Sequence, residues 1–503
     1  MTEPVWIGVD LGTQSVRALA VDDAGGTVAA TARPLRGRRA GPRHEQDPAT
    51  WWERTADALA ELSAALGGRP VGALAVCATS GTVLLTGPDG TPRTPGLMYD
   101  DSRAGALATE AQEAGAALWD RLGYRMQPAW ALPKLLWWRD EGRLAEPGAR
   151  LAHQADVVSA ALVGHPVAGD SSHALKTGYD LLADRWPAEV LERLRLDPAL
   201  LPEVVRPGSV LGEVGRAAAA RTGLPYGTPV IAGMTDGCAA QLGAGALGVG
   251  EWNAVLGTTL TLKGVSAALP RDPAGAVYSH RAPYGGLWLP GGASSTGAGA
   301  VRSLFPGTDP AALTAGAARV EPAGLPPCYP LVGAGERFPF VAPRARGFLG
   351  DGPLEVRGGD PAVTFAAVCV GVAHLERLAF EVLATSGADV GGAVSFTGGA
   401  ARNPWWNQLR CDMLGVPVRL PENPEPALGM AVLAAGAVRG DIPAAARRLV
   451  RVRRTLEPDP ERTARLTPGY QALVAALEGR GWLGGERGRD DDRGRTDPGA
   501  GRR

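Results

Sequence analysis

The chain has 503 residues, of which 45% are hydrophobic and 20% charged, so it can form packed cores, and its length alone suggests about three domains. A formal net charge of −1 offers no basic field for nucleic acid, so we expect no nucleic-acid partner. No run of ~18 apolar residues and no signal peptide is apparent, so we expect no membrane partner. The five cysteines include no C-x-x-C pair, which argues against a disulfide framework or a zinc site and favours the reducing cytoplasm.

The first predicted elements are a strand at residues 5–10, a turn at 12–15 and a second strand at 16–21. Asp47 and Pro48 are then the expected N-cap and first-turn proline of an amphipathic helix that runs to Leu66. Another strand follows at 71–77. Strands and helices continue to alternate beyond this point, which predicts an α/β fold.

A short sequence recurs at half the length of the chain. Leu11-Gly12-Thr13-Gln14 returns as Leu256-Gly257-Thr258-Thr259, and each copy lies between two apolar segments that predict strands. Recurrence of a strand–turn–strand unit at this separation predicts two copies of one fold.

The two turns have the composition of a phosphate site. Successive backbone N–H groups and hydroxyls at a tight turn form a concavity that suits phosphate oxygens, and Asp10 at the end of the first strand could hold a hydrated Mg²⁺ beside them. The alternative for the first copy alone is an ordinary hairpin with a solvated aspartate. Two such turns facing each other could clamp a triphosphate.

Asp236 follows a strand and a glycine and opens a helix of small residues. An aspartate at this position is either a helix cap or the general base that accepts the proton of an attacking hydroxyl. Both interpretations stay open on this segment alone.

Two further glycine-containing turns precede predicted helices. A strand at 394–396 leads into Gly398-Gly399, which would let a flat ring approach the backbone, although a structural turn would look similar. Residues 291–297 predict a small-residue turn that either faces phosphates or permits close packing. No Walker-A lysine pattern, no G-x-G-x-x-G after the first strand and no G-x-S-x-G elbow occurs, so P-loop, Rossmann and serine-hydrolase folds are disfavoured.

Taken in order, seven segments resemble the FGGY carbohydrate kinases. They are residues 10–15, 45–48, 99–103, 133–138, 233–245, 256–259 and 398–403. Within that family the chain is most similar to plant and cyanobacterial D-ribulokinases, which are also described as xylulokinase-like. That closer similarity lies in residues 78–85, 170–176, 278–280, 291–294 and 335–339.

The resemblance implies a duplicated actin-like, ribonuclease-H-like ATPase fold of two domains with a cleft between them. Residues 1–243 would form the sugar-binding domain and residues 244–482 the nucleotide-binding domain, with the last helices able to pack back on the first domain. Residues 483–503 are nearly devoid of apolar side chains, and we expect them to be a disordered tail.

The resemblance also implies roles for individual residues. Asp236 would be the catalytic base, and Asp10 would lie beside Mg²⁺ and the sugar. The implied sugar-pocket residues are Gln14, Ser15, Arg17 and Ser80. The implied nucleotide-site residues are Thr13, Gly257 and Thr258 at the phosphates, and Gly297, Gly398, Gly399, Ala400, Ala401 and Asn403 around the rest of ADP.

The expected function is ATP- and Mg²⁺-dependent phosphorylation of the C5 hydroxyl of a ketopentose, D-ribulose first, by a cytoplasmic monomer or homodimer. One alternative is the same chemistry on D-xylulose or another polyol. A second is an actin-like nucleotide-binding protein that does not phosphorylate sugar. Only three lysines, Lys134, Lys176 and Lys263, occur among the 51 basic residues, and the sequence assigns Lys176 no role.

Overall fold

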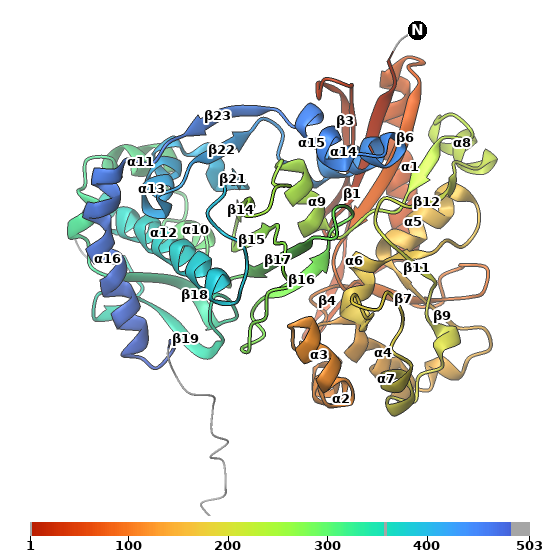
Figure 1. Ribbon diagram of the computed structural model, residues 1–503, viewed down its shortest axis with the longest axis horizontal. Coiled ribbons are helices and arrows are strands. Elements are labelled where there is room, and N and C mark those ends of the chain that lie inside the picture. The colour runs from red at the N-terminus through yellow and green to blue at the C-terminus, as the bar shows by residue number, and fades with distance from the viewer. Residues whose placement is uncertain (1–2, 357–359, 484–503) are drawn as a thin grey trace, which may run out of the picture.

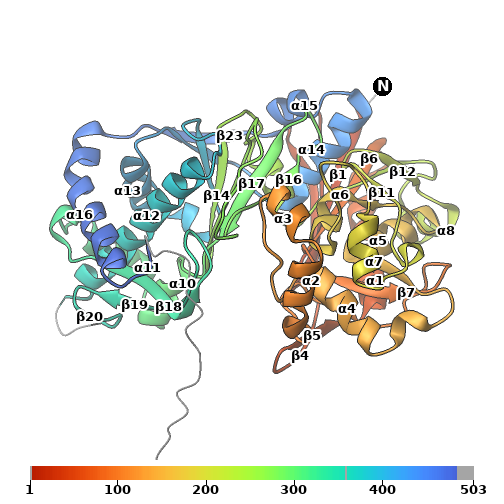
Figure 2. The ribbon, with the colours of Figure 1, turned by 60° about the horizontal axis from the view of Figure 1, so that its bottom comes forward.

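The computed structural model describes residues 3–356 and 360–483. Apart from Leu483, the expected disordered tail lies outside the described residues. Two large mixed sheets organise the chain, and they lie in separate halves of the molecule (Figures 1 and 2). We call the part built on the first sheet the first domain and the part built on the second sheet the second domain.

The first sheet has six strands in the order β12-β13-β6-β1-β2-β3. They are β1 (Val5–Leu11), β2 (Ser15–Val21), β3 (Thr27–Pro34), β6 (Val71–Ala78), β12 (Val210–Glu213) and β13 (Pro229–Ile231). β1 pairs antiparallel with β2 and parallel with β6, so the first turn joins two adjacent strands as predicted.

The second sheet has seven strands in the order β16-β17-β15-β14-β21-β22-β23. They are β14 (Trp252–Leu256), β15 (Leu260–Gly264), β16 (Tyr278–Arg281), β17 (Trp288–Ala293), β21 (Val394–Thr397), β22 (Val418–Pro421) and β23 (Val452–Leu456). From β17 to β23 it repeats the pairing directions of the first sheet from β3 to β12: two antiparallel, two parallel and one antiparallel pair. The predicted duplication is therefore confirmed at the level of topology.

Smaller strands extend both domains. They are β4 (Arg38–Ala40), β5 (Arg43–Gln46), β7 (Val83–Thr86), β8 (Gly96–Leu97), β9 (Arg150–His153), β10 (Gly169–Asp170), β11 (Val204–Val205), β18 (Cys328–Glu336), β19 (Ala342–Leu349) and β20 (Gly352–Pro353).

The expected turn at 291–297 is wrong in its first part, because Gly291 and Gly292 belong to β17 and pair with β15. A Cβ at Gly292 would meet the Phe338 ring at 2.4 Å, so packing explains the glycine there.

Helices cover both sheets. Those of the first part of the chain are α1 (Pro48–Leu66), α2 (Ala108–Ala114), α3 (Ala116–Leu122), α4 (Ala131–Asp140), α5 (Gln154–Val163), α6 (Ser171–Ala174), α7 (Ala188–Arg193), α8 (Arg216–Thr222) and α9 (Asp236–Gly243). Those of the second part are α10 (Gly299–Leu304), α11 (Pro310–Ala317), α12 (Pro361–Thr385), α13 (Pro404–Leu414), α14 (Pro426–Arg439), α15 (Ile442–Leu449) and α16 (Pro460–Glu478).

Helix α1 shows how local sequence sets an element. The Asp47 carboxylate accepts the N–H of Ala49 at 3.0 Å, Pro48 occupies the first turn, and Gly67 ends the helix in the left-handed conformation with φ 58°. These bounds agree with the sequence prediction.

Helix α14 is far along the chain but packs on the first sheet, against β1 and β6, and on α9 (Figure 1, where blue α14 lies beside red β1). Glycines allow this close approach, since a Cβ on Gly8 would be 1.8 Å from the Ala427 carbonyl and one on Gly429 would be 1.8 Å from the Ala239 carbonyl. The two domains are thus connected through α9 and α14. The boundaries at 243 and 482 stay predictions.

Helix α12 is 25 residues long and apolar enough, by length and composition, to cross a membrane. In the fold, 83% of its most apolar window is buried. It packs against α11, α13 and β18, so it is the central helix of the second domain's core.

Candidate active site

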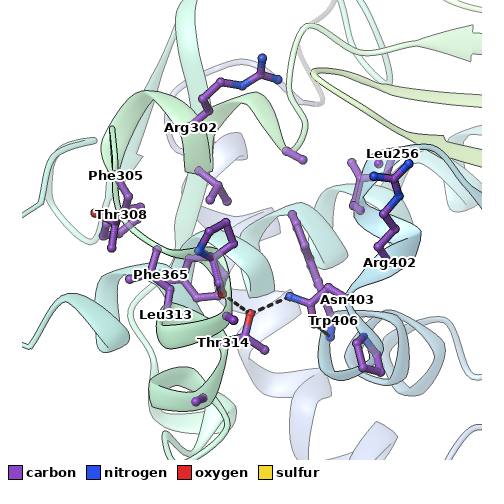
Figure 3. A pocket seen from close by; sticks show the side chains of 18 of the residues that line it. Leu256, Arg302, Phe305, Thr308, Leu313, Thr314, Phe365, Arg402, Asn403 and Trp406 are labelled. Atoms are coloured by element: carbon purple, nitrogen blue, oxygen red, sulfur yellow. Dashed lines mark hydrogen bonds between the residues drawn. The ribbon is translucent and has the colours of Figure 1, made fainter.

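The second domain contains a cavity of about 1010 Å³ beside the β14–β15 turn. Its apolar walls include Phe305, Leu313, Phe365 and Trp406, which come from α10, α11, α12 and α13 or their ends (Figure 3). Arg302 and Arg402 also line it and supply positive charge. An apolar cavity with a few fixed cations suits a flat base together with phosphates.

The turn after β21 shapes one wall of this cavity. Gly398 has φ 82°, and a Cβ there would be 2.6 Å from the Leu256 carbonyl oxygen, so the glycine is required by backbone contact. Gly399 and Ala400, which begin a 3₁₀ turn at Gly399–Arg402, face the cavity, whereas Gly398 and Ala401 do not line it.

Asn403 has both a structural position and a place in the cavity wall. Its Oδ1 accepts the N–H of Trp406 at 3.1 Å and so caps α13, while its Nδ2 donates to the Thr314 hydroxyl of α11 at 2.9 Å (Figure 3). Asn403 therefore ties two walls of the cavity together.

A backbone hydrogen bond closes each of the two predicted phosphate turns, and the second turn is one residue shorter than the first. The Gly12 N–H donates to the Ser15 carbonyl and the Gly257 N–H to the Thr259 carbonyl, each at 3.1 Å. Among the described residues, the N–H groups of Thr13 and Thr258 have no acceptor, so they can bind phosphate oxygens.

Only the second turn lies at the cavity. Gly257 and Thr258 line the cavity, and Arg302 donates to the Thr258 hydroxyl at 3.2 Å. In the first turn, Gln46 instead donates from Nε2 to the Thr13 carbonyl at 2.7 Å. Gly297 does not line the cavity, because it packs on the backbone of Thr258 and Thr259.

The two predicted carboxylates influence each other. Asp10 is buried at the end of β1, and desolvation together with the negative charge of Asp236 raises its pKa to about 7. Asp236 is the first residue of α9, with Thr235 as the N-cap, and its Oδ1 accepts the Gly237 N–H at 2.8 Å. Burial raises the pKa of Asp236, while that hydrogen bond and the charge of Lys176 oppose the rise.

Each of the three lysines of the chain lies near Asp236 or near the 80–81 turn. Lys134 is fully buried and donates to the Gly81 and Met98 carbonyls at 2.9 and 2.6 Å, and Lys176 donates to the Ser80 carbonyl at 3.0 Å. Lys263 donates to the Leu289 carbonyl at 3.2 Å, and the charge of Asp236 acts on both Lys176 and Lys263.

The predicted sugar residues lie around the same carboxylates on the first domain. Arg17 is the cross-strand neighbour of Asp10 and forms an ion pair with Glu425 at 3.4 Å. Gln14 is exposed and Ser15 is half-buried at the turn. The Ser80 hydroxyl is buried without a hydrogen-bond partner among the described residues, and the Ser80 carbonyl accepts a hydrogen bond from Lys176.

Comparison with known proteins agrees with this geometry. Residues 5–243 match the N-terminal domain and residues 253–438 the C-terminal domain of the FGGY family of carbohydrate kinases. The chain belongs to this family. It is an ATP-dependent sugar kinase with the two-domain actin-like, ribonuclease-H-like fold that the sequence predicted.

Several relatives of this kinase are named as xylulose kinases. The kinase is 33% identical to the xylulose kinase of Streptomyces coelicolor, over 88% of this chain and 90% of the relative, and 32% identical to that of Streptomyces rubiginosus, over the same shares. The crystal structure of xylulose kinase from Rhodospirillum rubrum is 27% identical, covers 94% of this chain and 98% of its own, and has a TM-score of 0.84.

The residues of the kinase fit a divalent metal bound through phosphates. No group of three or more acidic, histidine or cysteine side chains within residues 3–356 and 360–483 could hold a metal by itself. Mg²⁺, however, is usually held by one or two carboxylates plus phosphate oxygens, and Asp10 with its raised pKa is a carboxylate that a cation would stabilise.

Sequence reasoning missed several cavity residues of the kinase. Arg302, Phe365 and Trp406 come from α10, α12 and α13 and carry no local motif, so only the fold brings them together. For Lys176 a signal did exist, because a lysine retained where almost every other basic residue is arginine points to a position that the larger guanidinium does not fit.

Proposed function

We propose that this kinase transfers the γ-phosphoryl group of ATP to the primary C5 hydroxyl of a ketopentose, with Asp236 as the general base. The observation that carries the proposal is the pair of desolvated carboxylates, Asp10 directly before the first predicted phosphate turn and Asp236 near Lys176 and Lys263. A base with a raised pKa beside an acidic partner is an arrangement typical of catalytic sites.

Each residue has a defined task in this reaction. Asp236 accepts the proton of the attacking hydroxyl, and Lys176 keeps its carboxylate charged. The free N–H groups of Thr13 and Thr258 bind phosphate oxygens, and Arg302 adds positive charge beside Thr258. Mg²⁺, when bound near Asp10, would supply further neutralisation of the phosphate charge.

The nucleotide occupies the cavity of the second domain in this proposal. Its base lies between the apolar walls of Phe365 and Trp406 and beside Gly399 and Ala400, with Arg402 at the wall. The sugar lies on the first domain, where the unpartnered Ser80 hydroxyl and the Lys176 ammonium offer polar contacts. Gln14, Ser15 and Arg17 complete this proposed pocket.

D-Ribulose stays the predicted sugar, on the segments that resemble D-ribulokinases. D-Xylulose is the second candidate, and the names of the relatives from the two Streptomyces species favour it. A panel of sugars with coupled detection of ADP compares kcat/KM for D-ribulose and D-xylulose directly. The larger value identifies the substrate, and turnover of neither sugar would exclude both candidates.

Replacement of Asp236 tests the mechanism. Asp236→Asn should lower kcat by roughly 10²–10⁴-fold and leave nucleotide binding unchanged, because a general base contributes about that much. Asp459→Asn is the matched control, since it also removes a charge at a helix start, that of α16, where asparagine caps equally well. A fully active Asp236→Asn enzyme would exclude the assignment, and ATPase activity independent of sugar would favour the non-kinase alternative.

A further inference from the structure

The hydroxyl of Ser172 lies at a buried meeting point of three segments. It accepts the backbone N–H of Thr235 at 3.1 Å, and it lies 3.2 Å from the Thr235 hydroxyl and 3.2 Å from Nδ1 of His280. All three side chains are at most 1% exposed. Ser172 belongs to α6, Thr235 precedes Asp236, and His280 belongs to β16 of the second sheet, which contacts α6 (Figure 1).

These contacts use the full hydrogen-bonding capacity of the serine. A hydroxyl has one donor and two acceptor sites. The Thr235 N–H takes one acceptor site, so the Thr235 hydroxyl and the His280 ring share the remaining acceptor and the donor. Burial and the nearby charges of Lys263, Lys176 and His173 hold the pKa of His280 well below its usual value, so the ring is neutral and either arrangement is satisfied.

The serine is itself held firmly. Asp170 caps α6 by accepting the N–H groups of Ser172 and His173, each at 2.9 Å, and its second oxygen lies 2.6 Å from Nδ1 of His173. Nε2 of His173 lies 3.3 Å from the carbonyl oxygen of Ala78, and Ala78 forms a parallel bridge with Thr235. The Ser172 hydroxyl is therefore a fixed point relative to the backbone that enters α9.

We propose that Ser172 and His280 are positioning residues, which fix the backbone at Thr235 and so orient the Asp236 carboxylate toward the substrate hydroxyl. The inference rests on the proposed function, in which Asp236 is the base. It adds that the second domain takes part in orienting a base carried by the first, because His280 belongs to the second sheet. Loss of either contact should impair the chemical step rather than substrate binding, since orientation matters most in the transition state.

The neighbouring residue provides a matched control. Ser171 is 2% exposed, and its hydroxyl has no hydrogen-bond partner among the described residues. Ser171→Ala and Ser172→Ala thus remove the same atom from adjacent buried positions, and only the second removes contacts to Thr235 and His280. At His280, Asn retains a polar atom near the place of Nδ1, whereas Leu removes it.

The experiment measures kcat and KM for sugar and for MgATP in the full-length enzyme, with thermal unfolding as a check on folding. We expect Ser172→Ala and His280→Leu to lower kcat by about tenfold or more with both KM values nearly unchanged. Ser171→Ala and His280→Asn should keep kcat within about threefold of the parent enzyme, because neither removes the polar contacts of Ser172. A misplaced base explains the larger loss of kcat in the other two variants. Should Ser172→Ala fail to fold, the two His280 variants decide the question.

Two results would overturn the inference. One is equal kcat values for Ser171→Ala and Ser172→Ala, and the other is a kcat of His280→Asn as low as that of His280→Leu. If either occurs while Asp236→Asn is inactive, the positioning role is wrong and the proposed function stands. A fully active Asp236→Asn enzyme would overturn both.

Discussion

Gly297 offers a direct test of how packing controls the nucleotide site. A Cβ at this position would be 2.6 Å from Cα and from the carbonyl carbon of Thr259 and 2.8 Å from the carbonyl oxygen of Thr258. Carbon atoms in contact normally lie about 3.5 Å apart. Gly297→Ala must therefore displace the 257–259 turn by about 1 Å, because its Cβ would otherwise lie that much closer to Thr259 than a normal carbon–carbon contact allows.

The displacement cannot be absorbed by side chains, because backbone hydrogen bonds join the two segments. The Ala298 N–H donates to the Gly257 carbonyl and the Gly299 N–H to the Thr258 carbonyl, each at 3.0 Å. A shift of about 1 Å in a positioning element can cost about 10²-fold in rate, so kcat/KM for ATP should fall by that order. Overpacking should also lower the free energy of unfolding by ~1–3 kcal/mol.

Steady-state kinetics with varied ATP, together with urea unfolding, measures both effects. Gly324→Ala is the matched control, because Gly324 is exposed and a Cβ there would have nothing within 4 Å. The reasoning would be refuted if Gly297→Ala, like the control, kept kcat/KM for ATP within about twofold of the parent enzyme, a range that a 1 Å shift of the turn should exceed.

Three further predictions concern pH and stability. Because Asp236 must be ionised to accept a proton and burial raises its pKa, activity should rise with pH only above the ordinary carboxylate range near ~4, and initial rates across pH measure this limb. Burial lowers the pKa of Lys176 to about 8, so the ammonium that the proposed sugar pocket offers is lost at higher pH. Activity should then fall, and Lys176→Met should abolish that alkaline limb. Unchanged alkaline behaviour in Lys176→Met would contradict the assignment. In the core, Arg410 and Glu376 form a bidentate pair at 2.7 and 2.6 Å with both side chains fully buried, so Glu376→Gln should cost about 3–5 kcal/mol in urea unfolding by leaving an unpaired buried charge. Glu146→Gln, in an exposed pair with Arg143, should cost less than about 1 kcal/mol, and similar losses for the two variants would be inconsistent with this account.

Elements with strong local signals were predictable to within a residue or two. The start of α1 followed from Asp47 and Pro48, since a side-chain cap and a fixed φ act within one turn of the helix. The strands around the two phosphate turns followed from their apolar runs. The turn expected at 291–297 was wrong because glycine occurs there for a tertiary reason, the Phe338 ring against Gly292.

The sequence by itself determined the α/β class, through the alternation of predicted strands and helices, and the duplication, through a strand–turn–strand unit that recurs at half the length of the chain. Asp10 and Asp236 stay predicted catalytic residues, which the family resemblance supplied. Its composition showed that lysine is rare but not why. Only the tertiary structure brought Lys134 and Lys176 to the adjacent carbonyls of Gly81 and Ser80, and joined Ser172 to a histidine 108 residues away. A periodic apolar pattern shows which face of a helix or strand is buried, but it does not show which distant segment packs against that face.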